Sequence, residues 1–174
     1  MIANPATRNL VNFVLFQCAW LACVLYPGLG SGLFALAVVV FHLAVISQQR
    51  SMELQFIGLG IVLGGLMDSL WFRIGVLGLD SGEEIILAPP WLIAIWAVFM
   101  TTLCHSLNWI SAKRWLPFVL APVAGPFAYW SAGQLGVVNL PGLFTSLLGM
   151  AAGWLILFPL LLWLRRALYP ELVS

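Results

Sequence analysis

The chain carries very little charge. Of its 174 residues, 7% are Asp, Glu, Lys or Arg and 63% are hydrophobic, whereas a soluble domain has about 25% charged residues. A chain this poor in charge cannot surround a core with a wetted surface, so lipid must be its solvent. The composition excludes an ordinary soluble domain, and a net charge of +1 gives no indication of nucleic-acid binding.

Familiar catalytic motifs are also missing. The sequence has no G-x-S-x-G, no H-E-x-x-H and no glycine-rich phosphate loop. Its three cysteines lie in apolar segments, with a spacing that fits neither a zinc site nor a disulfide framework. We expect them to be small buried apolar residues, we predict no cofactor, and we lean toward a protein that is not an enzyme.

What the sequence has instead is a series of apolar runs. A membrane-spanning helix needs about 20 apolar residues, and turn-forming or charged segments separate six runs that approach this length. No small-x-small cleavage site follows the first run, so we expect it to be retained. The fold class is therefore an all-α polytopic membrane protein, one domain over residues 1–174, with six transmembrane helices and short loops. The expected spans are 10–26, 31–47, 54–72, 90–110, 116–134 and 142–166.

The basic residues predict the orientation. With six spans, both termini and the loops after the second and fourth spans share one side, and the opposite side holds only Arg73. Because Lys and Arg are retained in the cytoplasm, we expect a multi-pass protein with both termini cytoplasmic. The residues that share the first side are Arg8, Arg50, Lys113, Arg114, Arg165 and Arg166.

Small residues predict where helices approach one another. Gly60 and Gly64 are four residues apart, and Asp68 continues the same face of the third span. In the fifth span, alanines at 124, 128 and 132 form a similar stripe, and prolines at 122 and 126 interrupt the helix. Such a break either lines a pocket or is a simple packing kink.

Asp68 is the first candidate site. It lies about one turn below the outer boundary, and a charged group in hydrocarbon usually faces a partner or water. It is either a structural carboxylate that caps the next loop or bonds a neighbouring helix, or a ligand or proton site that opens outward. The residues predicted for such a ligand site are Asp68, Trp91, Trp96, Tyr129 and Gln134.

A second polar cluster is expected near the cytoplasmic side. His42 and His105 each lie about one turn from the inner end of their spans, and Thr101, His105 and Asn108 follow helical spacing. Asn12 and Gln17 of the first span are expected to join them. Two histidines without a nearby inner carboxylate are too few for a metal site, so we predict none. The alternatives are interhelical hydrogen bonds, a proton relay or a headgroup site.

Five segments in order resemble one known family: "NFVLFQCAWLACVL", "GLMDSLWFRIGVL", "PPWLIAIWAVFMTTLCHSLNWI", "GPFAYWSAGQLG" and "GWLILFPLLLWLRR". The family is domain of unknown function 2878, a group of small bacterial inner-membrane proteins. The resemblance covers nearly the whole chain and implies a location in the bacterial inner membrane, but no activity. It places His105 at a variable position. The family positions carried over are Asn12, Gln17, Asp68, Pro89 or Pro90, Trp91, Gly125, Pro126 and Tyr129, and, in the fourth span, Thr102, Leu103, Ser106 and Leu107.

Three classes of function follow. The first is a non-enzymatic accessory component of a membrane lipid or envelope system, which suits the short loops and the missing motifs. The second is a small-molecule transporter or substrate-binding membrane subunit with a site near Asp68. The third is an intramembrane lipid-modifying enzyme. The expected partners are membrane lipids, with another membrane protein as a further candidate and no nucleic acid.

Overall fold

The computed structural model describes residues 4–173 and is all-α, with six helices. Two short 3-10 helices, η1 (Asn108–Ala112) and η2 (Pro170–Leu172), and two short strands, β1 (Gly78–Leu79) and β2 (Val138–Asn139), complete the elements of the described chain. The α-helices are α1 (Pro5–Leu25), α2 (Leu29–Val45), α3 (Arg50–Arg73), α4 (Pro90–Cys104), α5 (Leu116–Gln134) and α6 (Leu143–Leu168).

Three of the helices, α1, α3 and α6, are long and apolar enough to cross a membrane. Helices α2 and α4 are apolar but shorter, with 17 and 15 residues. An α-helix rises about 1.5 Å per residue, so neither reaches the roughly 30 Å of a hydrocarbon core by itself.

Local sequence signals account for several helix ends. The Asn4 side chain caps α1 by accepting from the amide of Ala6 at 2.9 Å, and prolines open α1, α4 and α5 within their first two positions. Proline suits these positions because the first helical amides have no partner in the helix. Gly75 and Gly136, with φ of 73° and 76°, follow α3 and α5 and provide the left-handed turn that ends a helix.

Helix α4 ends earlier than the sequence predicts. The expected span was 90–110, but the helix stops at Cys104 and His105 leaves helical geometry. The hydroxyls of Thr101 and Thr102 bond back to the carbonyls of residues 98 and 99, and the side chain of Asn12 accepts from the backbone amide of Ser106. These side chains compete with the helical hydrogen bonds, and no glycine or proline marks the break.

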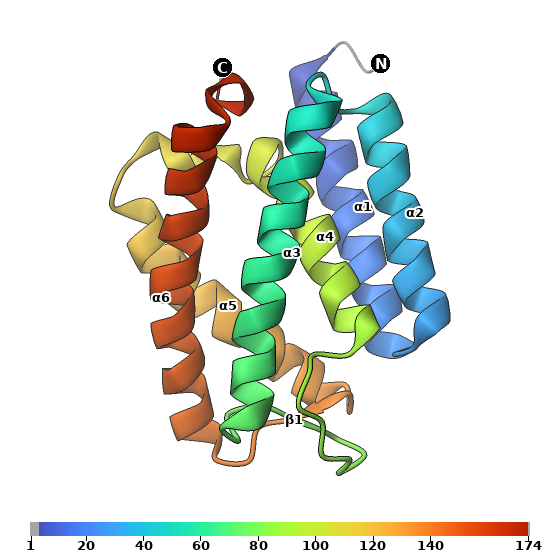
Figure 1. Ribbon diagram of the computed structural model, residues 1–174, viewed down its shortest axis with the longest axis vertical. Coiled ribbons are helices and arrows are strands. Elements are labelled where there is room, and N and C mark those ends of the chain that lie inside the picture. The colour runs from blue at the N-terminus through green and yellow to red at the C-terminus, as the bar shows by residue number, and fades with distance from the viewer. Residues whose placement is uncertain (1–3, 174) are drawn as a thin grey trace.

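The helices form two groups (Figure 1). Helix α4 lies against α1, α2 and α3, while α5 runs obliquely and packs mainly on α6, which touches α3. Both termini lie at the same end of the molecule. At the opposite end, β1 and β2 pair antiparallel with Gly78 opposite Asn139, and this pairing joins the loops that follow α3 and α5.

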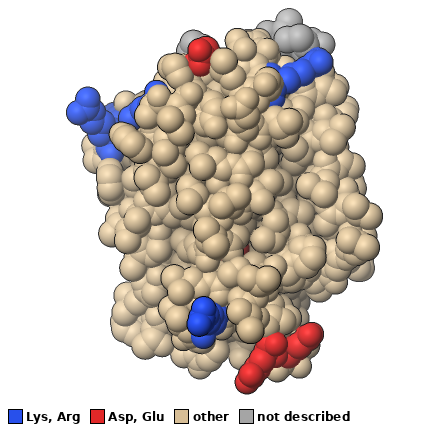
Figure 2. Space-filling model, viewed as in Figure 1, with Lys and Arg blue, Asp and Glu red and all other residues tan. Residues whose placement is uncertain are grey.

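The surface exposes many large apolar side chains, as expected of a membrane protein. Large apolar side chains such as Val40, Leu66 and Phe144 are 63–73% exposed. In Figure 2, Lys, Arg, Asp and Glu lie near the two ends, and an uncharged surface separates them. Of the cysteines, Cys23 is buried, Cys104 is intermediate and Cys18 is exposed, so the prediction of three buried cysteines is wrong for Cys18.

Candidate functional site

Asp68 is completely buried at the packed face of α3. Its Oδ2 accepts from Trp96 Nε1 of α4 at 2.6 Å, and its Oδ1 accepts from Tyr129 Oη of α5 at 2.5 Å. Each carboxylate oxygen therefore bonds a different helix, and hydrogen bonds to a charged group are stronger than bonds between neutral groups. The carboxylate joins α3, α4 and α5 at one point.

Glycines create the space for this arrangement. A Cβ at Gly64 would lie 2.1 Å from the ring of Trp96, so the indole reaches Asp68 only because residue 64 has no side chain. Trp96 also stacks on Trp154 of α6, with ring centroids 5.3 Å apart. A Cβ at Gly125 would lie 2.3 Å from Trp154 in turn. The close-packing face predicted from Gly60, Gly64 and Asp68 is therefore present.

The structure brings together part of the predicted outer site. Trp96 and Tyr129 contact Asp68 directly, and Trp91 is buried in α4. Gln134, the last residue of α5, is exposed and makes no hydrogen bond to Asp68. Its membership of a ligand site therefore stays a prediction.

The alanine stripe of α5 faces a cavity. With Gly125 and Tyr129, it lines a cavity of about 410 Å³, within the range of about 300–1,000 Å³ typical of ligand pockets. Residues from α1, α4, η1 and α6 complete the wall. The aromatic side chains in the wall are Phe16, Trp20, Trp91, Trp96, Phe99, Trp109, Tyr129, Trp154 and Phe158.

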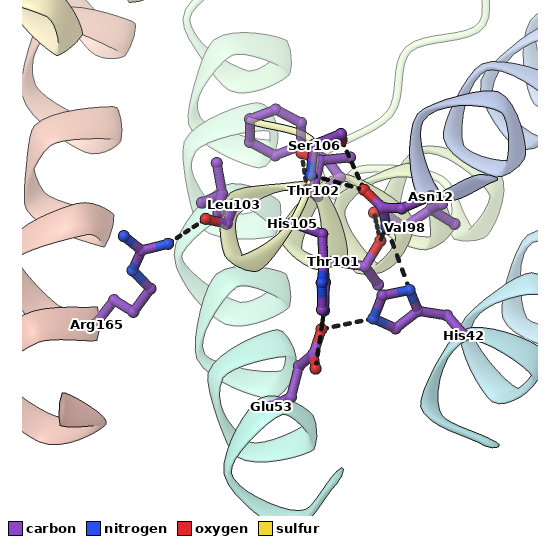
Figure 3. A network of polar contacts seen from close by, with 11 residues as sticks. Asn12, His42, Glu53, Val98, Thr101, Thr102, Leu103, His105, Ser106 and Arg165 are labelled. Carbon is purple, nitrogen blue, oxygen red and sulfur yellow. Dashed lines mark hydrogen bonds and ion pairs between the residues drawn. The ribbon is translucent and has the colours of Figure 1, made fainter. Parts of the chain in front are cut away.

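The second polar cluster centres on a carboxylate that sequence reasoning missed. His42 Nε2 lies 2.6 Å from Glu53 Oε1, and His105 Nε2 lies 3.1 Å from the same oxygen. All three residues are buried, and they come from α2, α3 and the residue that follows α4 (Figure 3). The premise that no inner carboxylate lies near the histidines is therefore wrong.

The expected third span, 54–72, leaves Glu53 outside the helix, but α3 begins at Arg50 and includes it in its first turn. A carboxylate is favourable there because it lies at the positive end of the helix dipole. The spacing of residues in this part of the sequence could have predicted that Glu53 is buried. Residues 53, 60 and 64 lie on one helical face, since steps of seven and eleven residues are close to whole turns, and Gly60 and Gly64 already marked the buried face.

Asn12 organises the cluster from α1. Its Oδ1 accepts from Ser106, from the backbone amide at 3.3 Å and from the hydroxyl at 2.6 Å. Its Nδ2 therefore faces Thr101 Oγ1 at 3.0 Å and His42 Nδ1 at 3.2 Å. An amide nitrogen only donates, so His42 Nδ1 accepts, and in the neutral ring Nε2 carries the proton that it donates to Glu53.

Two other predicted members lie elsewhere. Gln17 is exposed on α1, five residues beyond Asn12 and on a different helical face. Asn108 lies in η1 because α4 ends before it, and its Oδ1 accepts from Arg165 Nη2 at 2.9 Å. The helical stripe of Thr101, His105 and Asn108 predicted from the sequence is therefore broken at His105.

Arg165 completes the broken end of α4. It is fully buried, and it donates to the backbone carbonyl of Leu103, to Asn108 and to Ser111 Oγ at 3.1 Å. The last carbonyls of a helix have no partner within the helix, and in a membrane they must be satisfied by protein. This arginine therefore stabilises an interrupted helix and does not contact Glu53.

Comparison with known proteins shows the family. The family model described as "Protein of unknown function (DUF2878)" matches residues 9–160, a range that includes Asn12, His42, Glu53, Asp68 and Tyr129. No curated protein and no solved structure matches the chain. The chain therefore belongs to the DUF2878 family of proteins of unknown function.

Proposed function

We propose that the chain is a multi-pass protein of the bacterial inner membrane, with six spanning helices and both termini cytoplasmic. The three long apolar helices, the exposed apolar surface and the shared end of the two termini support this topology. The distribution of Lys and Arg supports the orientation, because cytoplasmic loops carry the excess of these residues. Arg165 and the protein contacts around the end of α4 allow a short helix to end at membrane depth.

We further propose that the protein binds the hydrocarbon part of a membrane lipid, or of a similar apolar molecule, without modifying it. The cavity between α5 and the α1–α4 group carries this proposal: its volume is about 410 Å³ and its wall is aromatic and aliphatic. A ligand inside it would be surrounded by dispersion contacts and would need few polar groups.

Two polar groups of the cavity wall are engaged with Asp68. Trp96 and Tyr129 line the cavity, and their N–H and O–H donate to the Asp68 carboxylate. The indole N–H of Trp154, in the same wall, is buried without a hydrogen-bond partner in the described chain. No wall residue is a Ser, Cys, His, Asp, Glu or Lys, so the wall offers no pair of nucleophile and base. These features favour a lipid-holding accessory protein over a lipid-modifying enzyme. The hydrogen bonds of Asp68 to Trp96 and Tyr129 support a role for this carboxylate in holding the wall in place.

A large side chain at Ala128 should fill the cavity and weaken binding. We expect Ala128→Phe to lower the affinity for a dansyl-labelled undecanoic acid about tenfold, because the phenyl ring occupies ligand volume. Binding is measured by fluorescence in detergent micelles, and co-purified lipids are identified by mass spectrometry.

Val123→Phe is the matched control, since Val123 lies on the same helix, is 69% exposed and does not line the cavity. Thermal unfolding of both variants shows whether they remain folded. The proposal is wrong if folded Ala128→Phe binds the probe as tightly as the wild type and Val123→Phe do, or if the wild type does not bind it.

A further inference from the structure

Glu53 is a buried anion with no basic partner other than histidine. Its side chain is 2% exposed, and within residues 4–173 its ion-pair contacts are with His42 and His105. Arg165, the nearby buried cation, is bonded to neutral acceptors instead. A buried carboxylate is costly unless a positive charge compensates it, so the cluster favours a cation at this point.

The geometry of the cluster suits a metal ion. One potential ligand atom from each of His42, Glu53 and His105 lies within 4.8 Å of the others. The three residues belong to separate segments of the chain, yet both rings present Nε2 to the same carboxylate oxygen. Imidazole nitrogen and carboxylate oxygen are ligands that divalent first-row transition metals take, at about 2.0–2.2 Å for Zn²⁺.

His105 provides an independent observation. The residue is 8% exposed, and its Nδ1 is buried without a hydrogen-bond partner in the described chain. Buried polar atoms are nearly always satisfied by protein, water or an ion. Nδ1 points away from Nε2, the ring nitrogen that faces Glu53, so Nδ1 is not a ligand at this site. Its lack of a partner means that no other hydrogen bond of the described chain fixes the tautomer of His105, and Nε2 is free to present its lone pair to a cation.

We propose that His42, Glu53 and His105 bind one divalent first-row transition-metal ion. The ion neutralises Glu53 and links α2, α3 and the chain beyond α4. Three protein ligands leave a further coordination position, which water or a small ligand takes in sites of this type.

Metal binding requires a change at His42. In the hydrogen-bonded cluster its Nε2 carries the proton donated to Glu53, and the metal displaces that proton. Nδ1 then becomes the protonated nitrogen, so Asn12 turns its amide to present oxygen to the ring. The hydroxyl of Ser106, now a donor to Asn12, can also accept and so can bond either orientation of the amide. The backbone N–H of Ser106 only donates, so its 3.3 Å bond to Asn12 Oδ1 is lost when the amide turns.

This site is separate from the hydrophobic cavity. Ile95 and Phe99 line the cavity from one face of α4, whereas Thr101 and His105 meet the cluster on another face. The metal proposal therefore does not depend on lipid binding, and either can fail without the other.

The experiment is a Zn²⁺ titration of the purified full-length protein with metal analysis. The chain has only two histidines, both in the cluster, so the purification tag must contain none. We expect one Zn²⁺ per chain and a higher melting temperature with the metal. Glu53→Gln and His105→Gln should each weaken binding at least tenfold. Glu83→Gln, in an exposed loop, should bind Zn²⁺ as the wild type does.

Failure of the wild type to bind Zn²⁺, or equal binding by the wild type and a folded Glu53→Gln, would overturn the proposal. If neither ligand variant folds, Co²⁺ absorption by the wild type decides. Bands typical of nitrogen and oxygen ligands support the site, and their absence contradicts it. A chelator should lower the melting temperature of the metal-loaded wild type back to the metal-free value.

Discussion

Replacing Asp68 with leucine is expected to lower the free energy of unfolding by about 3 kcal/mol. The substitution removes an acceptor of two hydrogen bonds and leaves the donors on Trp96 and Tyr129 buried without a partner. An unsatisfied buried donor costs about 1–3 kcal/mol. Because these donors come from two different helices, the loss should also loosen the contact of α5 with α3 and α4.

Two variants make this prediction specific. Asp68→Asn retains one oxygen acceptor and should lose roughly half as much stability as Asp68→Leu. Glu83→Leu removes an exposed carboxylate and should change the free energy of unfolding by less than about 0.5 kcal/mol. Unfolding in mixed micelles, followed by tryptophan fluorescence, measures all three. Equal losses for Asp68→Leu and Glu83→Leu would contradict a structural role for the buried carboxylate.

The second large effect is expected at Gly64. In Gly64→Ala the new Cβ would lie 2.1 Å from the ring of Trp96, which is anchored to Asp68 and stacked on Trp154. A rigid ring cannot yield without breaking these contacts, and overpacking a core typically costs about 1–3 kcal/mol. We expect Gly64→Ala to lie at the upper end of that range and to lower the affinity for the dansyl probe, since Trp96 forms part of the cavity wall.

The same helix offers two graded controls. A Cβ at Gly60 would meet the side chain of Met100 at 2.1 Å, but methionine is flexible, so Gly60→Ala should cost less than Gly64→Ala. Gly58 has nothing within 4 Å, and Gly58→Ala should stabilise the helix by up to about 1 kcal/mol. A melting series in any other order would show that Trp96 is not held as described.

The sequence predicts the cluster around Asp68 better than the second polar cluster around Glu53. The four-residue spacing of Gly60, Gly64 and Asp68 identifies the buried face of α3, because small residues mark close helix contacts in lipid. Trp96 and Tyr129, which the sequence places in one predicted site with Asp68, both donate to its carboxylate. Periodicity gives the depth and the face of a residue within one helix, which found two partners of Asp68 but also selected Gln134, which does not bond it.

The second polar cluster, around Glu53, depends on the residues at which helices begin and end. Hydropathy does not locate these residues. Glu53 was treated as loop because charged residues usually separate spans, although the helix had already started at Arg50. Asn108 was placed with the histidines because α4 was assumed to continue. The break at His105 depends on side chains from other helices, above all Asn12 of α1. The local sequence around His105 does not predict these contacts.

The alanine stripe of α5 shows a further limit. Small residues allow two helices to approach closely, but they equally leave space when large aromatic side chains hold the neighbouring helices apart. The stacked rings of Trp154 from α6 and Trp96 from α4 line the same cavity as the alanines. The alanines therefore face this cavity. Spacing alone cannot separate these two outcomes, because the decisive side chains belong to other segments.

The pairing of β1 with β2 has a consequence for the order in which the molecule is assembled. Gly78 follows the third helix and Asn139 precedes the sixth, so the chain must complete α4 and α5 before the two strands can meet. During synthesis the loop after α3 therefore has no partner strand until the chain has been made as far as β2. The pairing can therefore form only after α4 and α5 have been synthesised, and it joins two loops at the end of the molecule opposite the two termini.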